Sequence, residues 1–505
     1  MTILVLYFLH FALPSLAGGF NEDEMMNMYV YWFSGAFKSL WANVCFWTGS
    51  GRPGGALYYL PIYHFFSLNP QPYRIVQISI LTASIPMLYY LARLLASSRS
   101  VAFLGVLAFC YHAQLADLVF IGSFIYDVLC GFFYFAALTY YIHIREKGRS
   151  LRSTEFAAFL ALYIFALNCK EMAVTLPLIV LIYEALRRPR FGEWQQFVHR
   201  NWRFAVPALI AVLLTVPYVY GKTQGSNALA RVTGYTPDYS WHRFTTSNAH
   251  FVNELFYLVP NHVMTQGMLL VLWAAIFVYA FSRRDRMLEL MAFWVVITPL
   301  PLAFIPLRGG ACLYILLFGW AMIFAKLVSD LIRLLSESPI SVSQGVGAGA
   351  TTGTVIEGAA TNRRGAIIGA AAGKMWPQIF RMFATILVAS VLAIFTQWEN
   401  QRFGSVPASL LSIGQKASHV IQAFHSLDLH PVPGSMILLK PENRFYQNRY
   451  YPVFVASLVW NDHSLRIYVA TENQVTEQQI AKMDYIISLT EFQAKLVRAP
   501  DSDHP

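Results

Sequence analysis

Three consecutive acidic residues, Glu22, Asp23 and Glu24, follow the first apolar stretch of the chain. Beside a membrane surface, adjacent carboxylates repel one another and lose hydration, so a cation or a substrate must offset their charge. A carboxylate in that setting suits general-base work, in which it takes a proton from an attacking hydroxyl. A divalent cation such as Mg²⁺ or Mn²⁺, held by Asp23 and Glu24, would fit the same oxygen ligands. The structural alternative is a solvated loop after a helix end.

Two arginines stand beside glycines in segments that separate apolar runs. Arg52 begins the sequence Arg-Pro-Gly-Gly, and Arg308 is followed by two glycines. A planar guanidinium donates paired hydrogen bonds to phosphate, and glycine lets the backbone approach a ligand closely. Both arginines are therefore candidate phosphate ligands. The alternatives are an interfacial turn for Arg52 and, for Arg308, a side chain that extends from a helix end to the membrane surface.

A charged pair, Lys170 and Glu171, lies between two short apolar runs, within the sequence NCKEMAVTLP of residues 168–177. Polar groups at such a place are costly unless they are paired or functional. Asp127 lies about one turn inside another apolar run, where its carboxylate is expected to face the interior of a helix bundle. The alternative for Lys170 and Glu171 is that they only neutralise each other at the membrane interface.

The composition of the chain restricts the class of protein. The 505 residues are 56% hydrophobic and 13% charged, whereas soluble domains carry about 25% charged residues. This excludes a single water-soluble globule and a disordered chain, and five cysteines are too few for a disulfide scaffold. The formal charge is +10, but the basic residues cluster between apolar runs, as in cytoplasmic loops, so no nucleic-acid partner is expected.

Apolar runs recur along the chain, and a bilayer core needs roughly 20 helical residues. The predicted fold is an all-α polytopic membrane bundle of about 11 transmembrane helices, with a small C-terminal extracytoplasmic α/β domain. The predicted spans are 1–18, 74–96, 101–118, 122–144, 154–169, 172–187, 204–220, 266–282, 287–305, 311–334 and 377–396.

The distribution of Lys and Arg sets the orientation. One set of alternate breaks holds 20 of these residues and the other holds 8, and cytoplasmic loops collect them. This places loops 19–73 and 221–265 outside, and predicts a multi-pass protein of the inner (plasma) membrane whose site faces outside. Residues 1–18 are expected to be a retained span. A signal peptide is the alternative, although no Lys or Arg precedes the apolar stretch.

The chain divides into four parts by composition. Residues 1–334 are the predicted transmembrane core, and 377–396 are the last transmembrane helix. Residues 335–376, rich in Gly, Ala, Ser and Thr, predict a flexible cytoplasmic loop, with a small-residue packing helix as the alternative. The tail 397–505 predicts the external domain, with helices over 403–427 and 475–483. Its predicted strands are 435–440, 453–460, 465–470, 485–490 and 492–497.

In their order along the chain, these motifs resemble the polytopic GT-C glycosyltransferases, and most of all bacterial relatives of dolichyl-phosphate-mannose–protein mannosyltransferases. The resemblance covers residues 1–335, and residues 170–177 are its most specific part. It implies an enzyme that takes a sugar from a polyprenyl-phosphate donor at the external face of the membrane. The implied acceptor is a protein, a glycan or a lipid, and the implied transfer usually inverts the sugar.

The resemblance also implies roles for individual residues. Asp23 would be the catalytic base and Glu24 a co-ligand or orienting group, with Glu22 and Asp23 as the other possible register. Arg308, with Arg52, would hold the carrier phosphate. The residues implied to bind substrate or shape the site are Glu22, Arg52, Asp127, Lys170, Glu171 and Arg308.

One segment departs from the pattern of the family. Asp127 is retained, but residues 123–126 replace the expected arginine neighbourhood, which puts ligand contacts there in question. A competing reading is a non-enzymatic transporter or flippase that uses the same charged residues along a gated path, although the chain shows no paired broken spans. A third reading is a relative that keeps the fold as an interaction scaffold.

Overall fold

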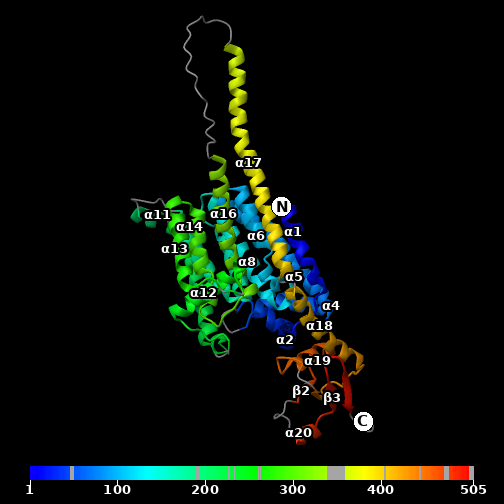
Figure 1. Cartoon of the computed structure of the whole chain (residues 1–505). Helices are drawn as coiled ribbons and strands as arrows, with labels where there is room; N and C mark the ends of the chain where they lie inside the picture. Colours follow the sequence, from blue (N-terminus) through cyan, green and yellow to red (C-terminus); the bar gives the residue numbers. More distant parts are fainter. Residues whose placement is uncertain are drawn as a thin grey trace.

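The computed structural model shows a long helical bundle with a small α/β domain at one end (Figure 1). It describes residues 1–45, 51–187, 194–225, 228–232, 234–259, 261, 263–337, 359–402, 405–442, 445–470 and 477–499. Half of the predicted cytoplasmic loop, residues 338–358, lies outside the described residues.

Long apolar helices build the bundle. Seven helices are long and apolar enough to cross a membrane, or up to nine if two bent helix pairs are each one span, counted over the described residues. The multi-pass membrane architecture is therefore supported, but the predicted count of 11 is not confirmed. The bundle helices are α1 (Thr2–Ala12), α5 (Pro70–Ala96), α6 (Arg99–Cys110), α8 (Ile125–Glu146), α9 (Ser153–Cys169), α10 (Leu176–Leu186), α11 (Trp194–Gln224), α13 (Gln266–Arg283), α14 (Arg286–Ile297), α16 (Tyr314–Glu337) and α17 (Ala359–Arg402).

The difference in the count comes from short and bent helices. The predicted spans 154–169 and 172–187 contain α9 and α10, which are only 17 and 11 residues long. A helix rises 1.5 Å per residue, so neither crosses a bilayer core of about 30 Å at full thickness. The predicted spans 1–18 and 101–118 belong to the two bent pairs, whose axes turn by 78° and 46°.

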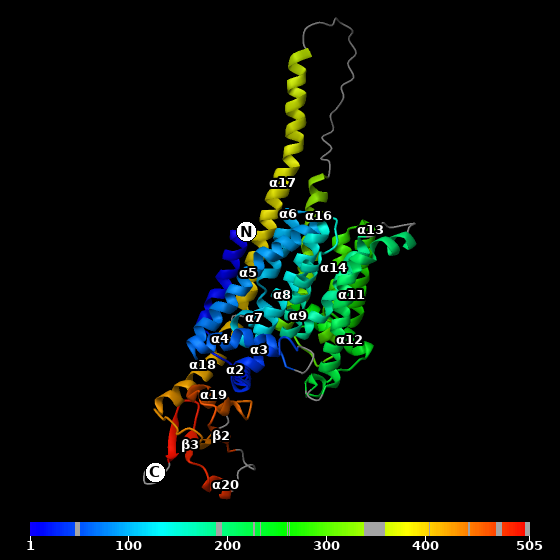
Figure 2. The same ribbon diagram turned by 180° about the vertical axis from the view of Figure 1, so that it is seen from behind.

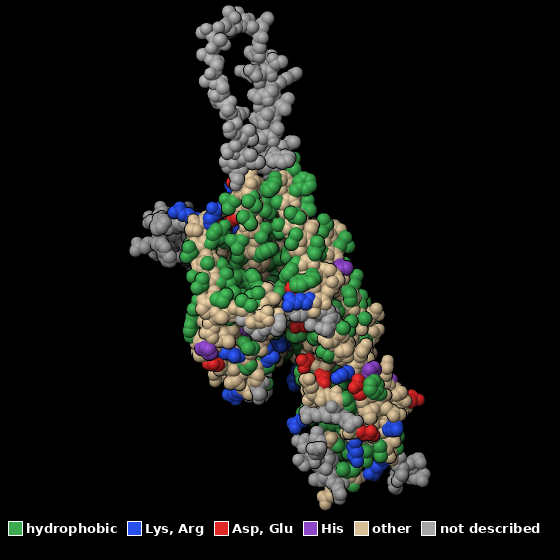
Figure 3. All heavy atoms as spheres, in the orientation of Figure 1, with side chains coloured by type: hydrophobic (Ala, Val, Ile, Leu, Met, Phe, Trp, Pro, Cys, Tyr) green, Lys and Arg blue, Asp and Glu red, His purple; other side chains and the backbone are tan. Residues whose placement is uncertain are grey.

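The surface of the bundle is apolar along its length. Exposed large hydrophobic side chains follow α13, α16 and α17, and Figure 3 shows hydrophobic side chains over the body of the bundle, with many of the charged ones nearer its ends and on the small domain. A soluble protein rarely exposes so large an apolar area, so this surface is suited to contact lipid tails.

Short helices gather at the end of the bundle that carries the small domain (Figure 2). Because they follow bends and glycine or proline turns, they do not continue the long helices, and two of them contribute residues to the cavity described below. They are α2 (Glu22–Ser34), α3 (Ala36–Trp41), α4 (Ala56–Phe66), α7 (Asp117–Phe120), α12 (Trp241–Leu255) and α15 (Leu300–Ala303).

The small domain is a four-stranded sheet with helices packed beside it. Its strand order is β2-β1-β3-β4, with β1 parallel to β2 and β3, and β4 antiparallel to β3. Helix α18 (Ser405–Ser426) and four of the predicted strands are confirmed. The domain consists of α18, β1 (Met436–Pro441), α19 (Tyr451–Trp460), β2 (Arg466–Val469), α20 (Glu477–Ala481), β3 (Tyr485–Leu489) and β4 (Ala494–Arg498).

The strand predicted over residues 453–460 is wrong, because this segment is helix α19. Its valines and aromatic residues have high β-propensity, but its local context outweighs that preference. Pro452 occupies the first turn of α19, and Asn461, in a left-handed conformation, ends it. The helix buries Phe454, Val455 and Leu458 against α2 and α18.

Helix α2 carries the acidic cluster and contacts the small domain at both of its ends. In its first turn, the Glu22 carboxylate accepts hydrogen bonds from the backbone N–H groups of Gln447 and Asn448, each at 2.9 Å. Near its last turn, Trp32 Nε1 donates to Asn461 Oδ1 at 2.7 Å, and the indole stacks on His463 with ring centroids 3.8 Å apart. The small domain is thus fastened to the helix that follows the first span.

A buried ion pair fastens the start of α2 to the bundle. Asn21 and Glu24 form a capping box, in which Asn21 Oδ1 accepts from the Glu24 N–H at 2.8 Å and Glu24 Oε2 accepts from the Asn21 N–H at 3.0 Å. Arg74 of α5 donates to the same Glu24 oxygen at 3.0 Å, and both side chains are almost completely buried. A Cβ on Gly122 would collide with this carboxylate, so Glu24 fills the available space.

Replacing Arg74 by Met tests this arrangement. The substitution leaves the Glu24 carboxylate buried without its charged partner, which costs about 3–5 kcal/mol of the free energy of unfolding. We expect a clearly lower midpoint of thermal unfolding in detergent. The matched control, Arg99→Met, removes an exposed arginine at the start of α6 and is expected to leave the midpoint nearly unchanged. Adding Glu24→Gln to Arg74→Met is expected to recover part of the loss; a loss that stays the same would contradict the ion-pair explanation.

Candidate active site

A cavity of about 580 Å³ opens among the short helices and the adjacent ends of the long ones. Its walls come from α2, the start of α8, the turn before α10, the end of α11, the segment 229–239 and the region 300–312. The volume lies within the range of small-molecule sites. The charged residues that line the cavity are Asp23, Arg52, Asp127, Lys170, Glu171, Lys222 and Arg308.

The structure therefore brings six of the eight predicted site residues into one cavity. The two that do not line it are Glu22, which binds the backbone of the small domain, and Glu24, which binds Arg74. Both are at the start of α2, where successive side chains point in different directions around the helix axis. Of the three adjacent acids, only Asp23 faces the cavity.

Asp23 occupies the first turn of α2, exposed toward the cavity. The axis of α2 turns by 78° from the axis of the helix before it, so Asp23 lies just after the bend between the two helices. Partial loss of water around the side chain raises the pKa of Asp23 above its ordinary value, and the neighbouring Glu22 charge adds to this effect. A carboxylate with a raised pKa is a better proton acceptor than an ordinary aspartate, provided that it is ionised at the working pH.

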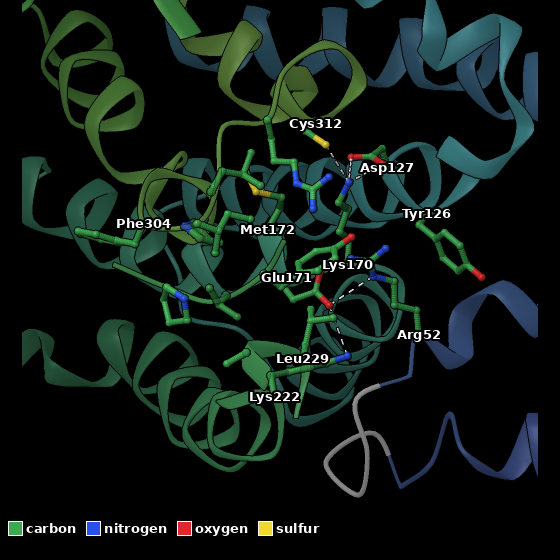
Figure 4. Close-up of a pocket in the computed structure, with 18 of the residues that line it drawn as sticks. Arg52, Tyr126, Asp127, Lys170, Glu171, Met172, Lys222, Leu229, Phe304 and Cys312 are labelled. Atoms are coloured by element: carbon green, nitrogen blue, oxygen red, sulfur yellow. Dashed lines mark hydrogen bonds and ion pairs between the residues drawn. The ribbon is translucent and has the colours of Figure 1, made fainter. Parts of the chain in front are cut away.

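Lys170 and Asp127 form a buried ion pair in the cavity wall (Figure 4). Lys170 Nζ lies 2.5 and 2.6 Å from the two Asp127 oxygens and 3.3 Å from Cys312 Sγ. The pair joins the start of α8 to the turn before α10 and contacts the segment that precedes α16. Mutual neutralisation, the structural alternative for Lys170, therefore involves Asp127 rather than the adjacent Glu171.

Glu171 lies between two cations, as Figure 4 shows. Its oxygens accept from Arg52 Nη2 at 2.9 Å and Nε at 3.3 Å, and Lys222 Nζ lies 3.4 Å away. Burial by itself would raise the pKa of Glu171, but the charges of Arg52 and Lys222 outweigh it and hold the pKa well below its ordinary value. Glu171 is thus an ionised carboxylate that holds two cations at the cavity wall.

Lys222 also lines the cavity, although its place in the sequence does not mark it as a site residue. It belongs to the last turn of α11, at the start of a predicted external loop, where an isolated basic residue is unremarkable. Besides Glu171, its ammonium group binds the Gly51 carbonyl at 2.7 Å, in the segment next to Arg52. No motif in the sequence links positions 52, 171 and 222, so only the folded chain shows this cluster.

Tyr126 is a second residue of the cavity wall that the sequence alone does not indicate. Its hydroxyl lies 2.7 Å from the Tyr31 hydroxyl, which donates to the Arg52 carbonyl at 2.6 Å. The Arg52 guanidinium lies 5.5 Å from the centre of the Tyr126 ring, within the distance for a cation–π contact. The segment 123–126, which departs from the family pattern, thus places an aromatic ring beside Arg52.

Arg308 is held in the cavity wall by backbone and aromatic contacts. Its Nη2 donates to the Gly234 carbonyl at 2.9 Å, and its guanidinium lies 4.5 Å from the centre of the Tyr235 ring. Neither contact neutralises its charge. The four cations and three carboxylates that line the cavity leave one positive charge in excess, which favours an anionic ligand.

The pair of residues expected to bind a divalent cation does not fit that role. The Glu24 carboxylate is committed to Arg74 and the α2 cap, away from the cavity that Asp23 faces. Within the described ranges, the side chains form no group of three or more potential metal ligands. Asp23 and Glu24 therefore do not face one another as joint ligands of a cation.

The depressed pKa of Glu171 predicts how its substitution depends on pH. The ionised carboxylate stabilises the fold at neutral pH, and this contribution declines only as the pH falls below the ordinary pKa of a glutamate. We expect Glu171→Gln to lower the midpoint of thermal unfolding at pH 7 and the difference from the unsubstituted protein to shrink toward pH 3. The matched control is Glu337→Gln at the far end of α16, where the carboxylate is exposed. An equal difference at both pH values would be inconsistent with an ion-pair origin.

Comparison with known proteins gives one informative likeness. No family model and no curated protein sequence matches the chain. Among solved structures, ArnT from Cupriavidus metallidurans in the apo state is similar with a TM-score of 0.51 and 13% identity, over 94% of this chain and 86% of that chain. The same protein bound to undecaprenyl phosphate gives a TM-score of 0.48 at 13% identity, with the same coverage.

A second solved protein is similar over most of the chain. The archaeal oligosaccharyltransferase AglB from Archaeoglobus fulgidus, in complex with an inhibitory peptide and a dolichol-phosphate, gives a TM-score of 0.44 and 10% identity over 96% of this chain and 69% of that chain. At such identities only the arrangement of the chain can be compared, and the apo ArnT structure carries that comparison. The chain therefore shares the overall fold of ArnT.

Proposed function

We propose that the protein is a membrane glycosyltransferase that moves a sugar from a polyprenyl-phosphate donor to a protein, glycan or lipid acceptor on the extracytoplasmic face of the membrane. The observation that carries this proposal is the convergence of Asp23, Arg52 and Arg308 on one cavity at the end of an apolar bundle. These residues are far apart in the sequence, and a base together with anion-binding groups is the set that such a transfer requires.

The donor phosphate would be bound by guanidinium groups. Arg308 keeps N–H donors beyond the one that binds Gly234, and its charge is not neutralised by its contacts. Arg52 is aligned by Glu171, which uses its Nε and Nη2 donors and leaves Nη1 for a ligand. Charge-assisted hydrogen bonds from guanidinium groups stabilise the phosphate both in the donor and as the leaving group.

Asp23 would act as the base. An acceptor hydroxyl oxygen attacks the anomeric carbon of the sugar, and Asp23 takes the hydroxyl proton. The bond from that carbon to the phosphate oxygen breaks, and the polyprenyl phosphate leaves with the electron pair. A single displacement of this kind inverts the anomeric configuration. The leaving group is already ionised, so catalysis depends mainly on positioning and on charge stabilisation.

The walls of the cavity suit a lipid-linked substrate. Leu300, Leu302 and Phe304 line one side, and Val219 belongs to the adjacent end of α11. These apolar side chains line the same cavity as Arg308, so a ligand bound there would have a phosphate beside a cation and hydrocarbon beside apolar residues. A carrier with a charged head and a long apolar tail matches both surfaces.

Substituting the base tests the proposal. We expect Asp23→Asn to lower the rate of sugar transfer by 100-fold or more, because the amide cannot accept the proton. The assay uses the purified protein in detergent or vesicles with a polyprenyl-phosphate sugar and a mixture of protein and glycolipid acceptors. Glu337→Gln, at the other end of the bundle, is the control and is expected to keep full activity. Full activity of Asp23→Asn would refute the assignment, and movement of the lipid-linked sugar across vesicles without a glycosylated product would favour a transporter.

The raised pKa of Asp23 predicts an acidic limb in the pH profile. The base works only when ionised, so kcat/KM falls as the pH drops through this raised pKa. Because the Glu22 charge contributes to the increase, Glu22→Gln is expected to shift the limb to lower pH. The other charged groups that line the cavity are Arg52, Asp127, Lys170, Glu171, Lys222 and Arg308, and all remain in this variant. A limb that does not move would contradict Asp23 as the group that titrates.

A further inference from the structure

Two carboxylates behind the cavity are not used by the proposed chemistry. Asp117 belongs to α7 and Glu254 to the last turn of α12, and neither lines the cavity. Both lie beside the turn of residues 308–312, which leads from α15 into α16. This turn carries Arg308 at its start and Cys312 at its end, and both of these residues do line the cavity.

Each carboxylate accepts a hydrogen bond from one backbone N–H of the turn. Glu254 Oε2 accepts from the Gly310 N–H at 2.9 Å, and Asp117 Oδ2 accepts from the Ala311 N–H at 3.0 Å. The two acids lie 56 and 194 positions away along the chain from the amides that they bind. They are therefore tertiary contacts that hold the turn between two helices, unlike a local helix cap.

The shape of the turn depends on this contact. A Cβ on Gly309 would collide with the Glu254 carboxylate, and a Cβ on Gly310 would collide with that of Asp117. Gly310 also has a φ of +55°, in the left-handed region that favours glycine. The glycines thus allow the two carboxylates to approach the backbone closely, which explains why Arg308 is followed by two of them.

The other side of the turn contacts the cavity groups. Arg308 binds Gly234 and Tyr235, and Cys312 Sγ lies 3.3 Å from Lys170 Nζ. The segment before the turn is held as well, because Arg243 Nε donates to the Ile305 carbonyl at 3.0 Å. The backbone that presents Arg308 is therefore fixed on both sides, and the two acids supply the fixed points on its C-terminal side, at Gly310 and Ala311.

We propose that Asp117 and Glu254 are positioning residues that clamp the turn 308–312 and so hold the Arg308 guanidinium at the donor phosphate. The identity of the ligand rests on the proposed function, whereas the two hydrogen bonds that form the clamp do not depend on it. Fixing a guanidinium before the ligand arrives lowers the entropy cost of binding. Loss of one carboxylate therefore weakens donor binding without removing any group that contacts the donor.

The clamp is tested first by amide exchange in the full-length protein. Asp117→Ala removes the acceptor of the Ala311 N–H, so hydrogen–deuterium exchange in peptides that contain Gly310 and Ala311 is expected to speed up by about tenfold. Asp117→Asn keeps an acceptor oxygen and is expected to restore most of the protection. Glu155→Ala is the matched control, because Glu155 also accepts a backbone N–H, that of Arg152 at 2.8 Å, at another helix start. Unchanged exchange in Asp117→Ala would overturn the proposal.

Binding of undecaprenyl phosphate then tests the role of the clamp. We expect Asp117→Ala to raise the Kd for undecaprenyl phosphate about tenfold, Asp117→Asn much less, and Glu155→Ala not at all. Because the clamp acts through Arg308, Asp117→Ala combined with Arg308→Gln is expected to bind no more weakly than Arg308→Gln alone. Additive losses would overturn the proposal. If Arg308→Gln itself binds as tightly as the unsubstituted protein, the proposed phosphate ligand is wrong, and amide exchange alone decides on the clamp.

Discussion

The buried contact between Glu24 and Arg74 determines where the rest of the site can lie. It fixes the first turn of α2 to α5, and the cap at Asn21 sets the rotation of the helix about its axis. With Glu24 turned inward, the preceding residue in the same turn must point elsewhere, and it is Asp23 that faces the cavity. The pair is costly to desolvate, and its contribution is to define one orientation of α2 rather than to add stability.

In the cavity wall, too, buried carboxylates are paired with cations. Asp127 neutralises Lys170, and Glu171 is shared between Arg52 and Lys222, so every buried carboxylate of the wall has a cation. Positive charge remains in excess because Glu171 is shared by two cations and Arg308 is held by a carbonyl and a ring. In a cavity built in this way the buried carboxylates are paired, and the net positive charge attracts an anion.

Much of the fold could be predicted from the sequence, because long apolar runs and basic breaks report directly on membrane spans. The helix of residues 405–426 and four strands of the small domain were also predictable from local patterns. The exact number of membrane spans could not be predicted, because α9 and α10 are apolar but short. How deeply these two helices enter the membrane depends on how they pack. Tertiary contacts also decide the structure of the segment 453–460. Its valines favour a strand, while its contacts with α2 and α18 favour a helix.

The candidate site was predictable where a residue type was unusual for its place. Asp127, Lys170 and Glu171 are charged groups next to apolar runs, and such groups are expensive without a partner. Lys222 and Asp117 gave no such signal, because a single charge near a helix end is common on any membrane protein. The roles of Glu22 and Glu24 could not be separated from that of Asp23 either, since three adjacent acids look equivalent until the partners Arg74 and the 447–448 backbone are known.

The attachment of α2 on two sides has a mechanical consequence. One side of the helix is bound to α5, while its two ends are bound to the small domain through Glu22 and Trp32. Because α2 is bound on both sides, the small domain cannot move away from the bundle without displacing the turn that carries Asp23. The small domain is therefore connected to the cavity wall through α2, and a force that a bound macromolecule exerts on this domain is transmitted to the turn that carries Asp23.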